Sequence, residues 1–206
     1  MRHCAMALVA VILGAFLVIG GCASQPARFY VLSALPGVET ASPATGGEQG
    51  PAIGVGQVTL PRYLDRPQIV SRTSPYELKL AEFDRWAEAL DANFSRVLAE
   101  NLSLLIPADR VAVFPWPRGT PIDYQVIVEV TDFTSQIGGE SVLIANWTLF
   151  RGEGQQGLLR GRSRLRAAAA GQDYAAMVAA MSQTVAALSR DIAAAIKGLA
   201  PTASAR

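Results

Sequence analysis

The chain has 206 residues, of which 50% are apolar and 17% charged, and its formal net charge is +1. A chain so close to neutral lacks the excess of lysine and arginine that drives binding to phosphate backbones. Nucleic acid is therefore excluded as a principal ligand, and the length suits one domain of ordinary size.

The first 21 residues have the pattern of an export signal. Arg2 gives a short basic start, and an apolar run follows at residues 5–19. This run of about 15 residues is shorter than the roughly 20 that a helix needs to cross a bilayer. It leads into Ile-Gly-Gly-Cys at residues 19–22, which resembles the lipobox of bacterial lipoproteins. We therefore expect a signal peptide at 1–21 that is cleaved before Cys22, and acylation of the Cys22 thiol.

Processing at this point would change what chemistry the chain can perform. It would leave 185 of the 206 residues, with equal numbers of cationic and anionic side chains. The sole histidine, His3, and the second cysteine, Cys4, both lie in the segment removed. The processed chain would then have no imidazole, free thiol or disulfide. That excludes Ser-His-Asp triads, cysteine nucleophiles and His- or Cys-ligated zinc, and we expect no cofactor.

The residue after the acylated cysteine bears on localisation. It is Ala23 rather than an aspartate, which resembles lipoproteins sorted to the outer membrane. We expect residues 22–27 to tether the domain to the periplasmic face of that membrane.

Strand-like and helix-like patterns alternate along the rest of the chain. Strands are predicted at 28–32, 52–60, 68–72, 76–81, 111–114, 123–136, 141–151 and 158–167, and helices at 84–105, with Asp84 as N-cap, and 173–199. The strands at 68–72 and 76–81 flank Thr-Ser-Pro and are predicted to form a hairpin, and the last three strands are predicted to form a meander. A Gly-, Pro- and Ser-rich stretch at 36–51 is predicted to be a mobile loop, and 200–206 a disordered tail. The order predicts an α/β fold: one domain over 28–199, with a single mixed, largely antiparallel sheet and two long helices packed on it.

The last predicted strand carries four arginines in alternate positions: Arg160, Arg162, Arg164 and Arg166. Since side chains alternate across a strand, all four should share one face, about 6.6 Å apart. Such a row could hold anionic phospholipid headgroups or an acidic partner surface. The alternative is a solvated face whose arginines pair with carboxylates of neighbouring strands, such as Glu129.

A second candidate contact is the rigid connector at residues 61–67, Pro-Arg-Tyr-Leu-Asp-Arg-Pro. Tyrosine and arginine are common anchors of protein interfaces. The candidate contact residues are Arg62, Tyr63, Asp65 and Arg66. The alternative is a structural connector with an internal Arg–Asp pair.

Catalysis would have to rest on carboxylates or on a Ser-Lys pair. Asp84 and Glu88 would lie one turn apart on the predicted helix, and Lys79 lies near Ser71 and Ser74 in sequence. A helix start and a solvated face explain the carboxylates better, and nothing in the sequence fixes a Ser-Lys geometry. We predict no catalytic residues.

Three stretches are similar to one family of bacterial lipoproteins. They are Tyr-Val-Leu at 30–32, the run from Ile53 to Val70 with its Leu-Pro-Arg-Tyr-Leu-Asp-Arg-Pro-Gln-Ile-Val, and Trp-Ala-Glu-Ala-Leu at 86–90 followed by Phe-Ser-Arg-Val-Leu-Ala-Glu-Asn-Leu at 94–102. Together they resemble the paraquat-inducible protein C (PqiC) lipoproteins, also called ABC-type transport auxiliary lipoproteins. The resemblance covers about residues 28–199.

The resemblance implies a non-enzymatic outer-membrane lipoprotein of an intermembrane lipid transport system that maintains envelope integrity. The implied partners are a periplasmic, tunnel-forming protein of the mammalian-cell-entry (MCE) type, which the lipoprotein would dock, and an inner-membrane component. The lipoprotein itself would form a homo-oligomeric ring. Two alternatives stay open: a lipoprotein that assists assembly of another outer-membrane component, and a lipid-anchored envelope hydrolase.

Overall fold

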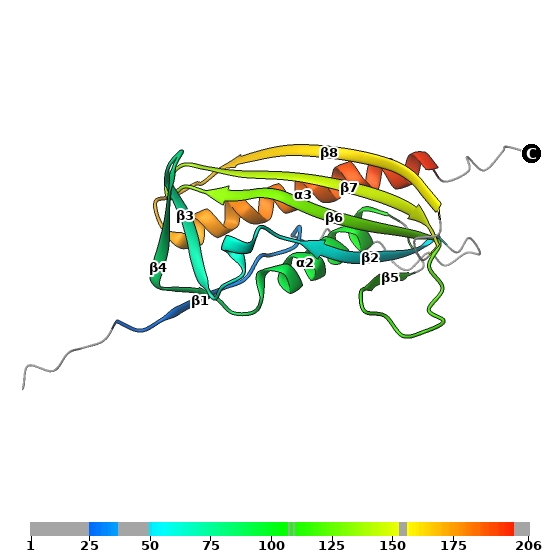
Figure 1. Ribbon diagram of the computed structural model, residues 1–206, viewed down its shortest axis with the longest axis horizontal. Coiled ribbons are helices and arrows are strands. Elements are labelled where there is room, and N and C mark those ends of the chain that lie inside the picture. Colours follow the sequence, from blue (N-terminus) through cyan, green and yellow to red (C-terminus); the bar gives the residue numbers. More distant parts are fainter. Residues whose placement is uncertain (1–24, 37–49, 107, 109, 153–155, 200–206) are drawn as a thin grey trace, which may run out of the picture.

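The protein, seen here as a computed structural model, is built from two β-sheets and two long helices (Figure 1). The structure describes residues 25–36, 50–106, 108, 110–152 and 156–199. The predicted signal peptide, Cys22, the tail and most of the predicted loop at 36–51 lie outside these residues. Among the described residues, no helix is both long and apolar enough to cross a membrane.

The larger sheet has five strands in the order β5-β2-β6-β7-β8. Its strands are β2 (Ala52–Thr59), β5 (Arg110–Val113), β6 (Tyr124–Ser135), β7 (Glu140–Arg151) and β8 (Gln156–Ala168). The three longest, β6 to β8, form the predicted antiparallel meander. Strand β2 instead pairs in parallel with both β5 and β6, which makes the sheet mixed.

A second sheet of three strands shows that the single-sheet prediction is wrong. Its order is β1-β4-β3, with β1 (Arg28–Tyr30), β3 (Gln68–Ser74) and β4 (Glu77–Trp86). The predicted hairpin of β3 and β4 is present, but β4 pairs on its other side with β1, in parallel. Local sequence indicates the hairpin, whereas the choice of its third strand depends on a contact with residues more than 50 positions away.

The first long helix, α2 (Leu90–Leu105), begins later than the sequence predicts. Residues from Asp84 to Trp86 belong to β4, and Ala89, not Asp84, is the N-cap residue. Pairing with β1 overrides the helical pattern, because Asp84 is held there by side chains of β1.

The second long helix, α3 (Tyr174–Leu199), confirms the prediction. The side chain of Asp173 caps it by accepting a hydrogen bond from the Ala176 backbone N–H at 2.8 Å.

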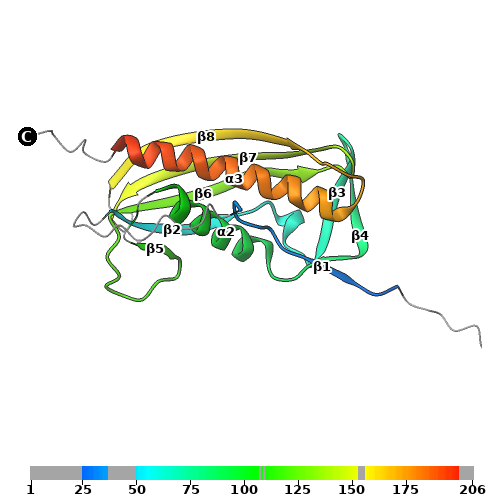
Figure 2. The same ribbon diagram turned by 180° about the vertical axis from the view of Figure 1, so that it is seen from behind.

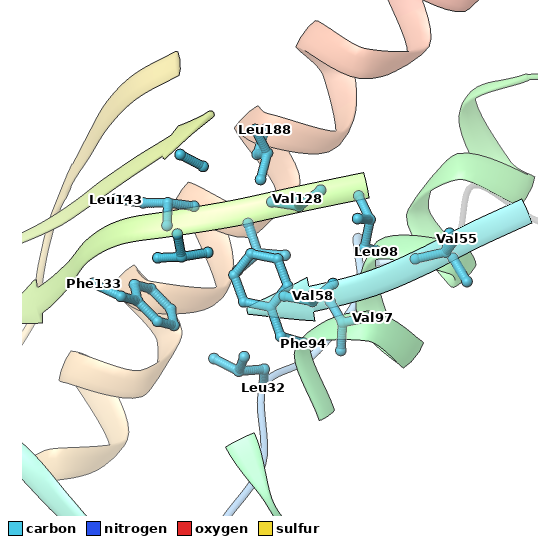
Figure 3. Packing of buried hydrophobic residues seen from close by; sticks show 14 of the residues in the cluster. Leu32, Val55, Val58, Phe94, Val97, Leu98, Val128, Phe133, Leu143 and Leu188 are labelled. Carbon is cyan, nitrogen blue, oxygen red and sulfur yellow. The ribbon is translucent and has the colours of Figure 1, made fainter. Parts of the chain in front are cut away.

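Both helices cover the same face of the five-stranded sheet. They lie behind it in Figure 1 and in front of it in Figure 2. The buried cluster between them and the sheet includes Leu32, Phe94 and Phe133, whose rings or methyl groups meet at its centre (Figure 3). The two phenylalanine rings stand edge to face with centroids 5.7 Å apart. This packing fixes which face of the sheet is left for other contacts.

Candidate functional site

The segment that follows β1 runs as a strap between the two helices. We use "strap" for residues 31–35. Its backbone N–H groups donate to side chains of α2 and α3: Leu32 to Asn93 Oδ1 at 2.6 Å, Ser33 to Ser182 Oγ at 3.1 Å and Leu35 to Asn101 Oδ1 at 2.7 Å. An extended segment here has no strand to pair with, so helix side chains supply its acceptors.

Two buried asparagines of α2 organise this contact. Asn93 and Asn101 are 1% and 0% exposed, and they lie about two helical turns apart on one face. Asn101 Nδ2 also donates to Ser189 Oγ on α3 at 3.0 Å. Sequence reasoning missed both residues, although a polar side chain within the apolar stripe of a helix was the available signal.

Strand β1 adds an ionic contact next to the strap. Asp84 accepts the Arg28 Nε–H at 2.8 Å and the Tyr30 hydroxyl at 2.8 Å. Burial, and then the carboxylate of Asp84, raise the pKa of Tyr30. Residues 28–35, which begin six positions after Cys22, are thus fixed to the folded domain.

The four arginines lie on the face of the five-stranded sheet that no helix covers. All four are exposed, and their partners on β7 are Thr148, Asn146, Ile144 and Val142. Arg166 pairs with Glu140 at 2.9 Å. Arg160, Arg162 and Arg164 form no ion pair with any described residue.

The pairing with Glu129 that the solvated-face alternative offered is not made. Glu129 lies opposite Asn146 on β7, which in turn lies opposite Arg162, so a full strand separates the two charges. We use "arginine row" for Arg160, Arg162 and Arg164, three cations on an open face that have no ion-pair partner in the part of the chain that the structure describes.

The connector is a short turn with one buried residue. Arg62–Leu64 form a 3-10 helix, η1, in which Leu64 is 3% exposed while Arg62 is exposed. Asp65 and Arg66 are exposed as well, and the internal Arg–Asp pair is absent among these residues. Backbone hydrogen bonds hold the turn instead.

Tyr63 faces inward rather than outward, where the two sheets meet. It packs against the core cluster and lies beside Asp132 of β6. Burial, and then the Asp132 carboxylate, raise the pKa of Tyr63. Arg72 of β3 lies 3.9 Å from the same carboxylate. Tyr63 therefore serves the junction between the sheets, which weakens it as a partner contact.

The connector and the arginine row are not brought together. The connector follows β2, and the row lies on β8 with β6 and β7 between the two strands. They are separate surfaces, each to be tested on its own.

The catalytic alternatives find no geometric support among the described residues. Asp84 and Glu88 do not share a helix, and they are ion-paired with Arg28 and Arg96 respectively. The Ser71 hydroxyl contacts the backbone oxygen of Lys79, at 3.5 Å, rather than its amine. No three His, Cys, Asp or Glu residues of the described part lie together in a way that could hold a metal ion.

An open groove of about 360 Å³ lies between the strap and α3. Its lining is mostly small and apolar, and among the described residues that line it Tyr30 alone is ionisable. Ser33 and Ser182 also line it, but no carboxylate, imidazole or amine of the described lining stands beside them as a base.

Residues 30–193 match the family model described as "ABC-type transport auxiliary lipoprotein component". The chain is 31% identical to "Intermembrane transport lipoprotein PqiC" of Escherichia coli (strain K12) over 137 residues, which are 66% of this chain and 70% of that protein. The same figures hold for the protein of that name in Shigella flexneri.

Solved structures show the same fold. A crystal structure of an uncharacterized protein has a TM-score of 0.67 at 26% identity, covering 84% of this chain and 99% of that one. A Xanthomonas campestris protein has a TM-score of 0.63 at 17% identity, covering 84% and 97% of the two chains.

Proposed function

Because this chain belongs to the family of ABC-type transport auxiliary lipoprotein components, we propose that it is a non-enzymatic docking subunit of an MCE-type intermembrane lipid transport system. In this proposal, Cys22 is acylated and holds the domain on the periplasmic face of the outer membrane. The domain docks the periplasmic, tunnel-forming MCE partner, which connects to an inner-membrane component.

The observation that carries the docking role is the arginine row on an uncovered sheet face. Arginine is enriched at protein interfaces, and its planar guanidinium forms two parallel hydrogen bonds with a carboxylate. Three such groups about 6.6 Å apart on one strand form a linear pattern of positive charge. An acidic partner surface with matching spacing would be attracted and held in register by that pattern.

Strand β8 also offers its backbone. It has 13 residues and is the last strand of the sheet, and in both views no element lies beyond it (Figures 1 and 2). An edge strand can pair with an extended segment of another chain, with main-chain hydrogen bonds giving affinity. We propose that an extended acidic segment of the partner adds to β8, its alternate carboxylates reaching the arginine row.

The strap connects docking to anchoring. Its three N–H donors bind to side chains of both helices, and the same helices pack on the sheet that carries β8. The docking strand is therefore held in a fixed position relative to the start of the domain at Arg28.

The test places a photo-crosslinking amino acid at Asn146, which lies between Glu129 and Arg162 on the open face. The tagged, full-length lipoprotein is irradiated in its native envelope, and partners are identified by mass spectrometry. A crosslink to an MCE-domain protein is expected. The matched control carries the same group at Glu100, exposed on α2, and should give no such crosslink.

Two further outcomes decide against the proposal. Capture at Asn146 of an unrelated outer-membrane assembly factor would favour a role in assembly. Capture of no partner, together with an unchanged envelope when Cys22→Ala prevents anchoring, would reopen the enzymatic alternative.

A further inference from the structure

The end of the domain nearest the anchor exposes apolar and cationic side chains together. Phe29 on β1 is 64% exposed and Val31, two residues on, is 44% exposed. In the three-stranded sheet, Phe29 lies opposite Arg85, which lies opposite Gln68. Arg85 is exposed, as is Arg66 just before β3. We call Phe29, Val31, Arg66 and Arg85 the anchor-side patch.

Among the described residues, the arginines of this patch are free to bind an anion, although an exposed carboxylate, Asp65, precedes Arg66. Neither Arg66 nor Arg85 forms an ion pair there. The nearby carboxylates of Asp84 and Glu88 are already paired with Arg28 and Arg96. The patch therefore presents the guanidinium of Arg85 next to the exposed Phe29 ring, and that of Arg66 just before β3, on the other side of β4.

An exposed phenylalanine alone would mean little, since single apolar side chains are common on protein surfaces. The short separation in sequence between Phe29 and the acylated cysteine is what gives this exposed ring a meaning. Phe29 follows Cys22 by seven residues, a span of about 25 Å at full extension. A diacylated Cys22 would be held at the level of the lipid headgroups, so Phe29 cannot lie far from the membrane surface.

The chemistry of the patch suits that surface. Phenylalanine is among the side chains that interfacial segments bury at the boundary between headgroups and acyl chains, and arginines near it interact with anionic headgroups. Figure 1 shows β1 leaving the body of the domain at one end, while the loop between β5 and β6 lies at the other. A domain resting on its β1 end would direct the β5–β6 loop away from the membrane.

We propose that the anchor-side patch rests on the phospholipid surface, with Phe29 at the level of the headgroups and Arg66 and Arg85 on anionic phosphates. The inference rests on acylation of Cys22 and not on any partner. It assigns the domain a fixed orientation on its membrane, which acylation alone would not give.

The test uses the absence of other thiols in the processed chain, whose only cysteine is Cys22. A Phe29→Cys variant of the full-length lipoprotein is labelled with an environment-sensitive dye and reconstituted into phosphatidylcholine vesicles with or without phosphatidylglycerol. We expect a blue shift of the dye emission, and quenching by brominated lipids. The matched control, Arg118→Cys in the β5–β6 loop, should show neither.

A second comparison tests the contribution of the two arginines separately from that of Phe29. Replacing Arg66 and Arg85 with Gln in the Phe29→Cys protein should reduce the extra quenching that phosphatidylglycerol causes. If the Phe29 and Arg118 labels behave alike in every vesicle, the orientation is wrong, even if the MCE partner is captured through β8. Binding of the patch to another envelope protein would appear as dye shielding in native membranes but not in pure lipid vesicles, and it would likewise overturn the proposal.

Discussion

The two faces of the five-stranded sheet differ in what they contact, and strand β8 shows the difference residue by residue. Toward the helices it presents Leu165, Ser163 and Gly161, opposite Leu143, Ala145 and Trp147 of β7. Toward solvent it presents the arginine row. One strand thus supplies both a wall of the core and an open charged surface, because side chains alternate across it.

Close packing and buried hydrogen bonds hold the side chains of the inner face, whereas the outer face of β8 presents exposed charges. Trp147 lies across Gly161, where a Cβ atom would overlap the indole ring. The indole N–H donates to Ser163 Oγ at 3.1 Å, and the Ser163 hydroxyl donates to Asp191 Oδ2 of α3 at 2.6 Å. No comparable contact with a described residue holds Arg160, Arg162 or Arg164. Substitutions on the inner face should therefore act on stability, and those on the outer face on binding.

The largest effect is expected from the centre of the inner face. Phe94→Ala removes a ring that is 0% exposed and that packs edge to face with Phe133. The free energy of unfolding should fall by about 3–5 kcal/mol, which is much of the stability of a domain this size. Denaturant unfolding followed by circular dichroism measures it. Phe114→Ala, at a ring 55% exposed, is the control and should cost about 1 kcal/mol or less.

A smaller effect is expected where the indole covers the strand. Gly161→Ala places a methyl group against Trp147, and the ring or the strand must shift, at a cost of about 1–3 kcal/mol. Gly157→Ala in the same strand meets only an ordinary contact with Phe150, at 3.8 Å, so it should change stability by less than about 0.5 kcal/mol. Equal losses for the two variants would contradict the role given to Trp147.

The periodicity of the sequence predicted which side chains of β8 lie on each face of the sheet. Its predictions were wrong where the structure depends on contacts between residues far apart in the sequence. The alternation at 158–167 placed the arginines on one face, and the four- and three-residue spacing of apolar residues located α3. Asp84 was misplaced at a helix start because its partners, Arg28 and Tyr30, lie more than 50 residues earlier. The acceptors for the strap were missed for the same reason.

The candidate site was predicted less fully than the fold. The arginine row could be predicted because residues at alternate positions of a strand lie on the same face of the sheet. The connector was less informative: the sequence shows Tyr63 beside Arg62 and Asp65, but only the packed structure shows that the ring turns inward to Asp132. Which exposed residues meet a partner depends on the partner, and no single sequence encodes that.

The boundary between the sheets gives a prediction that depends on pH. The pKa of Tyr63 is raised above its ordinary value of 10.0 by burial and then by Asp132. The neutral phenol is favoured in the folded state, so its contribution to stability is complete below pH 10 and is lost as the pH rises through the folded pKa. Tyr63→Phe should therefore show a shallower loss of stability above about pH 10 than the unsubstituted protein.

Thermal unfolding at a series of pH values measures this difference. Tyr76→Phe is the control, because the Tyr76 side chain is 99% exposed and contacts neither sheet junction nor core. An identical alkaline profile for Tyr63→Phe and the unsubstituted protein would show that Tyr63 does not titrate as a buried junction residue.

The smallest effect on stability is expected on the outer face, and it should coincide with the largest effect on binding. Replacing Arg160, Arg162 and Arg164 with Gln removes three exposed cations that have no ion-pair partner among the described residues. The free energy of unfolding should change by less than about 0.5 kcal/mol. Crosslinking of the partner from Asn146 should nevertheless be lost, because the charges that match an acidic surface are gone.

Leu165→Ala is the matched variant for this experiment, since Leu165 stands next to Arg164 but points toward Leu143 and the core. It should cost about 1–3 kcal/mol of stability and leave the crosslink intact in the protein that remains folded. If the glutamine variant instead loses stability and keeps its crosslink, the outer face would be a structural surface like the inner one. The two faces would then differ in composition alone, and docking would have to be sought on another surface.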